Sequence, residues 1–249
     1  MDYSNIFLGI FTFNRTPNYY DWTIRQMVQK QPDFDGKIHI YISQLKQDGS
    51  DFVDAPLLDL GFKNYTKTFF TKHEKQKSSG ALIHTLVIQN QKFLRDFLNS
   101  NCDYAIGFED DLVISHNYLL YNDLMVRKVF ERYQTKKVLI SPYSSWKTDK
   151  GFGLEIQEMP KNFHGTQMIV YSRDLAKDIL EYMDTRYWQE HHFLPYDIML
   201  NNYIQNIDLS IPFVSYHYSP VQHNGNISSG LGGGHTTPNF DENMINSLL

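Results

Sequence analysis

Cysteine is almost missing from this sequence. Cys102 is the only one in 249 residues, which excludes an intrachain disulfide framework and a zinc site made of cysteines. Proteins of a reducing compartment rarely carry disulfides. We therefore expect a cytoplasmic protein.

Long hydrophobic runs are missing as well. No apolar stretch approaches the roughly 18 to 20 residues that a membrane span requires. The residues before Ile6 include an acid, Asp2, where a signal peptide would carry a basic region. We expect no membrane span and no secretory signal, and docking of the folded protein on a membrane surface stays open.

Positive charge is scarce. Lysine and arginine number 23 against 28 acidic residues, for a net charge of -5, and the basic cluster at 72–77 is short and contains Glu74. Such a chain exerts no long-range attraction on a phosphate backbone. We therefore expect no nucleic acid among its partners.

The residues that are present fit one large domain. A chain of 249 residues, 41% of them hydrophobic, can bury a sizeable core but is short for two enzymatic domains. We expect a single domain over residues 1–249. Its 17 tyrosines, 17 phenylalanines and 3 tryptophans indicate either sugar-stacking surfaces or a bulky core.

The stretch 103–115 organises the chain. Residues 104–108 are apolar on both alternating faces except at one glycine, which predicts a strand buried on both sides, and Glu109, Asp110 and Asp111 follow at once. Open α/β sheets bind ligands outside the carboxyl ends of their strands. A divalent cation, held by one or two carboxylates and by substrate phosphates, would relieve the repulsion among these acids. A solvated acidic turn is the alternative.

Segments with strand and helix patterns alternate along the chain. We expect strands at 6–12, 37–43, 65–70, 104–108, 138–141, 165–172 and 211–216. We expect helices at 20–28, 82–97, 117–133, 173–183 and from 197 to about 205. This alternation predicts an α/β fold, with a central mostly parallel sheet flanked by helices.

One predicted helix begins in a way that suits an anion. The sequence Ser78-Ser79-Gly80 precedes it, so free backbone N–H groups and the positive end of the helix dipole would face a ligand near Gly80. A plain helix start is the alternative.

Four motifs in this order resemble the nucleotide-sugar-dependent glycosyltransferases of the GT-A fold, a Rossmann-like architecture. Glu109-Asp110-Asp111 is similar to their Asp-X-Asp motif. The segments 165–166, 195–200 and 220–229 resemble the N-acetylglucosaminyltransferase IV family, although Asn224 stands where that family has isoleucine. The resemblance implies that residues from 1 to about 115 bind the nucleotide and that residues from about 116 to 222 bind the acceptor. The glycine-rich tract 223–249 would be flexible.

The resemblance also implies a metal site. Asp111 would ligate Mn²⁺ or Mg²⁺ directly, Asp110 would contact the ribose or a metal-bound water, and Glu109 would shape the turn. His223 is the candidate third protein ligand, and a structural histidine is its alternative. The cation would act as a Lewis acid on the departing nucleoside diphosphate.

Asp197 is the candidate general base for an acceptor hydroxyl, which implies inversion at the anomeric carbon. A helix N-cap is the alternative role for this aspartate.

Positions at strand ends supply further candidates for the nucleotide. Thr12, Asn14 and Arg15 follow the first strand, with Arg15 near phosphate or base, and Ser43 at the end of the second strand would reach the base.

Together these features predict a metal-dependent glycosyltransferase. It would move a hexosyl or N-acetylhexosaminyl group from a nucleotide sugar, UDP-linked by the resemblance, to a glycan or glycoconjugate hydroxyl. A sugar-binding module without turnover and a metal-dependent phosphotransferase or nuclease are the alternatives. Two-metal enzymes need acids from several elements, and this chain has one cluster plus Asp197.

Overall fold

The computed structural model describes residues 3–13, 19–44, 64–71, 79–143, 154–161, 165–190, 194–224, 237 and 239–248. The predicted contacts Asn14 and Arg15 lie outside these residues. So do the glycines at 225–234 and Trp146, one of the three tryptophans that the sequence offers for sugar stacking. No helix in the described part of the chain combines the length and the apolar character needed to cross a membrane.

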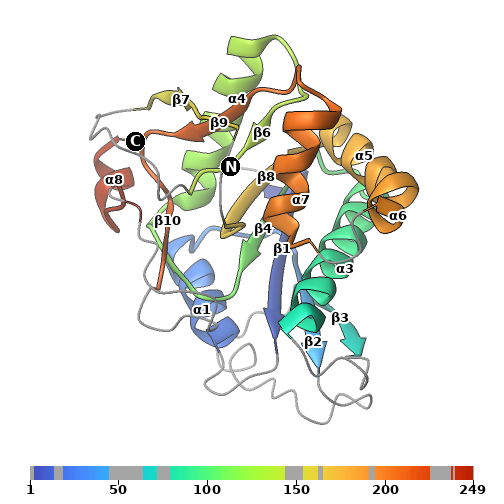
Figure 1. The fold of residues 1–249 in the computed structure, drawn as a ribbon. Helices are drawn as coiled ribbons and strands as arrows, with labels where there is room; N and C mark the ends of the chain where they lie inside the picture. Colours follow the sequence, from blue (N-terminus) through green and yellow to red (C-terminus); the bar gives the residue numbers. More distant parts are fainter. Residues whose placement is uncertain are drawn as a thin grey trace.

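The architecture is α/β, and the predicted sheet flanked by helices is confirmed (Figure 1). The large sheet has the order β3-β2-β1-β4-β8-β6-β9-β7. Its strands are β1 (Ile6–Phe13), β2 (Ile38–Gln44), β3 (Tyr65–Thr71), β4 (Tyr104–Glu109), β6 (Leu139–Ile140), β7 (Ile156–Glu158), β8 (Met168–Ser172) and β9 (Phe213–Tyr216). Strands β1 to β4, β6 and β9 share one direction, whereas β7 and β8 run against it.

Helices cover both faces of this sheet. They are α1 (Tyr19–Lys30), α3 (Ser79–Leu98), α4 (Tyr118–Tyr133), α5 (Arg173–Tyr182), α6 (Trp188–Glu190), α7 (Tyr196–Asn202) and α8 (Met244–Leu248). A 3-10 helix spans Tyr3–Asn5, and π-helical turns span Met183–Tyr187 and Tyr203–Ile207. Helices α1 and α4 pack on one face, and α3, α5 and α7 pack on the other.

The alternation of β1 builds both layers of the core. Successive side chains of a strand point to opposite faces, so Leu8 and Ile10 join α1 and α4, while Phe7 and Phe11 join α3. This two-sided burial is what the apolar run in the sequence predicts. Ser172 caps α5, because its Oγ accepts a hydrogen bond from Leu175 N at 3.2 Å.

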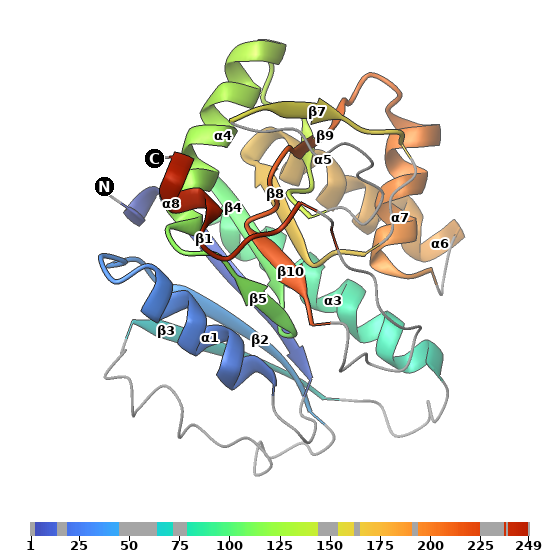
Figure 2. The same cartoon turned by 90° about the vertical axis from the view of Figure 1, so that its left-hand side faces the viewer.

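A second, two-stranded sheet lies apart from the large one (Figure 2). β5 (Leu112–Ile114) pairs antiparallel with β10 (Val221–His223). The sequence patterns did not predict these strands or β7. The C-terminal residues run beside this small sheet, since Ser115 Oγ donates to Asp241 O at 3.2 Å and His116 N donates to Glu242 O at 3.1 Å.

Candidate functional site

The three acids lie where the parallel strands end. β4 finishes at Glu109, opposite Phe11 of β1, and the carboxyl ends of β1, β2 and β3 point toward the bottom of Figure 1. Asp110 and Asp111 are only 3% and 4% exposed. The alternative of a solvated acidic turn is therefore wrong.

Asp110 turns back toward β1. Thr12 Oγ1, itself fully buried, donates to Asp110 Oδ2 at 2.7 Å. The predicted nucleotide contact Thr12 thus holds a member of the acidic motif. A second hydroxyl, from Thr23 of α1, donates to the backbone oxygen of Asp110 at 2.6 Å.

Asp111 lies beside His223, as the predicted metal site requires. The two residues come together because β10 pairs with β5, and Asn224 N donates to Asp111 O at 3.0 Å. His223 Nε2 is 3.4 Å from Asp111 Oδ2, and His223 is 9% exposed.

The chemistry of this pair fits a divalent cation. Neighbouring ligands of an octahedral ion at about 2.1 Å lie about 3.0 Å apart, a few tenths less than the 3.4 Å seen here. Among the described residues, no group of three or more His, Cys, Asp or Glu side chains is arranged to hold a metal. Two protein ligands suffice when substrate phosphates supply the others.

Glu109 is held by the loop before β8. Thr166 Oγ1 donates to Glu109 Oε1 at 2.6 Å, and Glu109 N donates to Gln167 O at 3.1 Å. Burial, followed by the negative charge of Asp111, raises the pKa of Glu109 to about 7, and the hydrogen bond from Thr166 acts in the opposite direction. These contacts fit the turn-shaping role that the resemblance implies.

Asp197 faces the same loop. Gly165 N donates to Asp197 Oδ2 at 3.0 Å, and Ile198 N donates to Asp197 Oδ1 at 2.9 Å. Pro195 occupies the N-cap position of α7, so Asp197 is not the N-cap residue, although its carboxylate accepts from an N–H of the first turn. The charge of Asp197 contributes to the raised pKa of Glu109, which places the two carboxylates near each other.

Gly165 is required at this joint. Its φ is +88°, a backbone conformation that side chains rarely adopt, and a Cβ here would lie 2.2 Å from Gln167 Oε1. Because Gly165 binds Asp197 and the next residue, Thr166, binds Glu109, this dipeptide joins the predicted base to the acidic motif.

The remaining predicted contacts are Ser43 and Gly80. Ser43 is buried at the end of β2, opposite Phe13 of β1, one strand beyond Thr12. Gly80 lies in the first turn of α3.

Two further residues lie at this edge, and only Gln89 was missed by the sequence interpretation. Tyr143, one of the tyrosines that the sequence offers for sugar stacking, follows β6 and is buried, and burial together with the charges of Glu109 and Asp111 raises its pKa. Gln89 of α3 donates its amide hydrogens to Thr12 O at 3.1 Å and to Tyr41 O at 2.9 Å, which ties β1 to β2. The sequence did contain a signal for Gln89, because a glutamine on the apolar face of a predicted helix indicates a buried polar side chain that needs hydrogen-bond partners.

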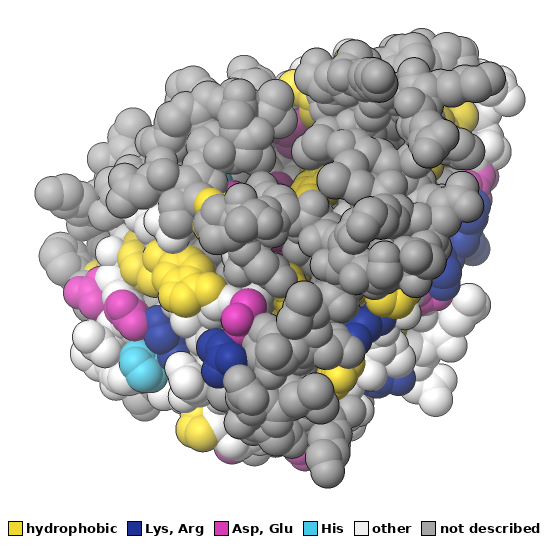
Figure 3. All heavy atoms as spheres, turned by 90° about the horizontal axis from the view of Figure 1, so that it is seen from below, with side chains coloured by type: hydrophobic (Ala, Val, Ile, Leu, Met, Phe, Trp, Pro, Cys, Tyr) yellow, Lys and Arg dark blue, Asp and Glu magenta, His cyan; other side chains and the backbone are white. Residues whose placement is uncertain are grey.

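Figure 3 views the molecule from this end, where hydrophobic, acidic and basic side chains of described residues reach the surface. A separate cavity of ≈ 540 Å³ lies at the opposite edge of the sheet, lined among others by Ile6, Lys37, Asn64 and Cys102. These residues stand at or before the amino ends of β1 to β4. This cavity is therefore remote from the acids.

Comparison with known proteins gives distant likenesses. No family model and no curated protein matches the chain. A crystal structure of the galactosyltransferase LgtC in complex with donor and acceptor sugar analogues is similar, with 11% identity, 78% of this chain and 69% of that chain covered, and a TM-score of 0.47. A structure of the LgtC active-site mutant Q189E covers the same shares at 10% identity, with a TM-score of 0.46. Likeness at this level says nothing about what this chain binds or transforms, so the function rests on the site itself.

Proposed function

We propose that this protein is a metal-dependent glycosyltransferase that moves a sugar from a nucleoside diphosphate to a hydroxyl of a glycan or glycoconjugate. The observation that carries the proposal is the placement of Asp111 Oδ2 3.4 Å from His223 Nε2 at the carboxyl edge of the sheet. A carboxylate and an imidazole at this spacing suit Mn²⁺ or Mg²⁺, and this edge is where open α/β sheets bind ligands.

Each residue then has a task in binding the donor. Asp111 and His223 would hold the cation, which when bound supplies a Lewis acid for the diphosphate leaving group. Asp110, fixed by Thr12, would accept a hydrogen bond from the ribose. Ser43 on the next strand would face the base, which we infer to be uracil because of the resemblance of the motifs.

Asp197 would complete the reaction as the general base. The N–H of Gly165 fixes one of its oxygens, and a carboxylate has lone pairs for further hydrogen bonds. An acceptor hydroxyl bound there would give its proton to Asp197 while its oxygen attacks the anomeric carbon. The bond to the diphosphate breaks on the opposite face, so the configuration inverts.

Calorimetric titration with UDP, with and without Mn²⁺, tests the donor site. The wild type should bind one UDP per chain only when Mn²⁺ is present. Asp111→Asn should abolish this binding and leave the melting temperature almost unchanged, because an amide keeps the shape and loses the charge that attracts the cation. Binding of UDP and Mn²⁺ by Asp111→Asn as tight as that of the wild type would remove the metal site from the proposal.

Turnover separates the enzyme from a binding module of the same fold. The test is a screen for hydrolysis of UDP-, GDP- and TDP-sugars, with Asp111→Asn as the blank. One donor should be consumed, and only when the wild-type protein and Mn²⁺ are both present. Metal-dependent binding without consumption of any donor would support the binding module.

A further inference from the structure

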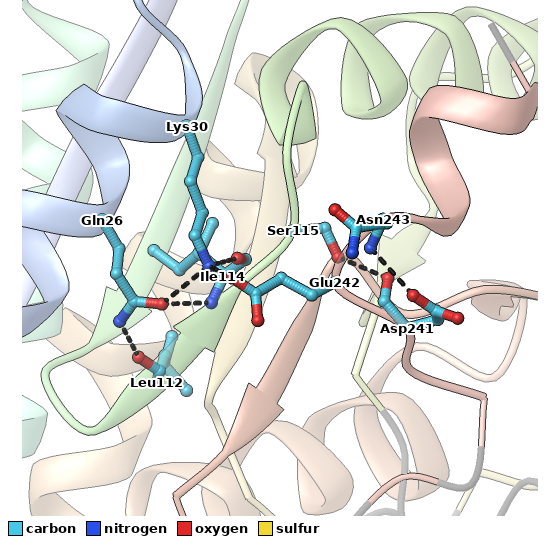
Figure 4. A network of polar contacts seen from close by, with 8 residues as sticks. All are labelled: Gln26, Lys30, Leu112, Ile114, Ser115, Asp241, Glu242 and Asn243. Carbon is cyan, nitrogen blue, oxygen red and sulfur yellow. Dashed lines mark hydrogen bonds and ion pairs between the residues drawn. The ribbon is translucent and has the colours of Figure 1, made fainter.

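Strand β5 has no strand on one of its two edges among the described residues, and helix α1 takes that place. The other edge pairs with β10. Successive residues of a strand offer their N–H and C=O groups to opposite edges. Asp111 O accepts from Asn224 N on the β10 side. The backbone N–H and C=O groups of Leu112 and Ile114 therefore point to the other edge, toward α1 (Figure 4).

Three side chains of α1 satisfy this second edge. Thr23 Oγ1 donates to Asp110 O at 2.6 Å and accepts from Leu112 N at 3.3 Å. Gln26 Nε2 donates to Leu112 O at 2.9 Å, and Gln26 Oε1 accepts from Ile114 N at 3.0 Å. Lys30 Nζ donates to Ile114 O at 2.5 Å. We name Thr23, Gln26 and Lys30 the α1 ladder.

The spacing of the α1 ladder explains how a helix can serve a strand. Positions 23, 26 and 30 are i, i+3 and i+7, so they share one face of the helix. Polar groups cost stability when they are buried without partners, and these three residues are only 0%, 7% and 9% exposed. Their burial is tolerated because the backbone of the acidic turn is their partner.

The ladder brackets the proposed metal ligand. Thr23 binds the peptide oxygen of Asp110 and the peptide N–H of Leu112, the residues on either side of Asp111. Gln26 fixes the next peptide groups, and β10 holds the opposite edge with His223. The separation of Asp111 from His223 therefore depends on both edges of β5.

We propose that Thr23 and Gln26 are positioning residues for the divalent cation. They set the orientation of the peptide groups around Asp111, and through them the geometry of the Asp111–His223 pair. This inference rests on the proposed function. Residues that orient metal ligands without touching the metal typically contribute about 10- to 100-fold to its affinity, and we expect an effect of that size.

Variants of Thr23 and Gln26 test the inference. Thr23→Val keeps the shape of the side chain and loses the hydroxyl, while Thr23→Ser keeps the hydroxyl. Gln26→Met keeps the length and loses both hydrogen bonds. The probe is Mn²⁺ itself, titrated at the same fixed concentration of UDP for every variant and followed by the electron paramagnetic resonance signal of the free ion. All measurements are made well below the melting temperature of each variant.

A matched control separates positioning from stability. Ser172→Ala removes the cap of α5 at the opposite edge of the sheet and should lower the melting temperature without changing the affinity for Mn²⁺. Thr23→Val and Gln26→Met should weaken Mn²⁺ binding by about 10- to 100-fold, and Thr23→Ser should restore most of it.

The possible failures are distinguishable. Three results would show that the α1 ladder is purely structural: wild-type affinity for Mn²⁺ in folded Thr23→Val or Gln26→Met, an equal loss of affinity in Ser172→Ala, or failure of both ladder variants to fold. Each of these results would overturn the inference while the proposed function stands. A wild type that binds UDP without Mn²⁺ would overturn the proposed metal site as well.

Discussion

Asp197 shows at the scale of one residue how a carboxylate is fixed without occupying the N-cap position. Its two oxygens accept from Gly165 N and Ile198 N, and Pro195 begins the helix. The side chain therefore couples α7 to the loop before β8. Its charge contributes to the raised pKa of Glu109, and this proximity to the acidic motif is consistent with the proposed role of Asp197 as the general base.

Asp197→Asn and Asp197→Ala should separate chemistry from structure. Asparagine keeps one acceptor oxygen for Gly165 N but places an NH2 group beside Ile198 N, so the melting temperature should fall less than in the alanine variant, while transfer should fall by about 10²- to 10⁴-fold because the proton acceptor is gone. Alanine should lower both the rate and the melting temperature, since it leaves two N–H groups without this partner. Initial transfer rates and thermal melts measure these effects.

Metal-dependent UDP binding is the control for both variants and should persist, because Asp111 and His223 lie on other elements. An Asp197→Asn protein that transfers at the wild-type rate would remove Asp197 from the mechanism.

At the scale of elements, strands β1 and β4 approach α3 through two neighbouring glycines. Gly9 and Gly107 lie opposite each other. A Cβ on Gly9 would lie 2.4 Å from Phe93 Cε2, and one on Gly107 would lie 2.8 Å from Phe11 Cε2. The missing side chains form a recess for aromatic rings, which lets α3 pack close to the sheet.

Gly9→Ala should therefore destabilise the fold. Phe93 is fully buried, so its ring has little room to move, and overpacking of this kind typically costs about 1 to 3 kcal/mol. The free energy of unfolding in urea measures the loss. The double variant Gly9→Ala, Phe93→Leu should lose less than the sum of the single changes, and full additivity would argue against this packing.

The elements differ in how far the sequence predicts them. β1, β2 and β4 carry long apolar or alternating runs, and the structure has them within one or two residues of the predicted limits. β8 was predicted as a strand, but its direction depends on its neighbours and not on its own pattern. β5 and β10 have three residues each, too few for a period, and their partners are distant in the chain.

The residues of the site also differ in how far the sequence predicts them. The acidic motif could be predicted because it follows a buried strand directly, and the motif resemblance proposed His223. The α1 ladder could not, because polar residues beside the apolar face of a helix normally meet solvent. Only the tertiary structure shows that Thr23, Gln26 and Lys30 are buried. Gly165 lies on a loop, whose contacts no periodicity reports.

At the scale of the whole molecule, stability should depend on pH through a histidine remote from the site. His39 stacks on Phe7 with ring centroids 4.0 Å apart, and its Nδ1 is 2.8 Å from Thr66 Oγ1. Burial, helped by the positive charge of Lys37 and opposed by Asp96, lowers its pKa from 6.5 to about 4. The folded protein therefore keeps this ring neutral in mild acid.

Between pH 6.5 and 4 the unfolded chain binds a proton at His39 that the folded chain does not, so stability should fall as the pH falls through this range. Above pH 6.5 this residue contributes no pH dependence. His39→Gln, which can still bond to Thr66, should lose less melting temperature than the wild type between pH 6.5 and 4. Parallel melting curves for the two proteins would contradict the assignment.

The ion pair of Lys30 with Glu242 has a consequence for biosynthesis. The two residues are 212 positions apart, and ribosomes add about 5 to 20 residues per second. Helix α1 therefore waits roughly 10 to 40 s for this partner to be translated. His223 emerges only shortly before Glu242, so the nascent chain has its acidic motif long before its second proposed metal ligand. A growing polypeptide of this kind would lack the second ligand of the proposed cation site until residue 223 has been synthesised.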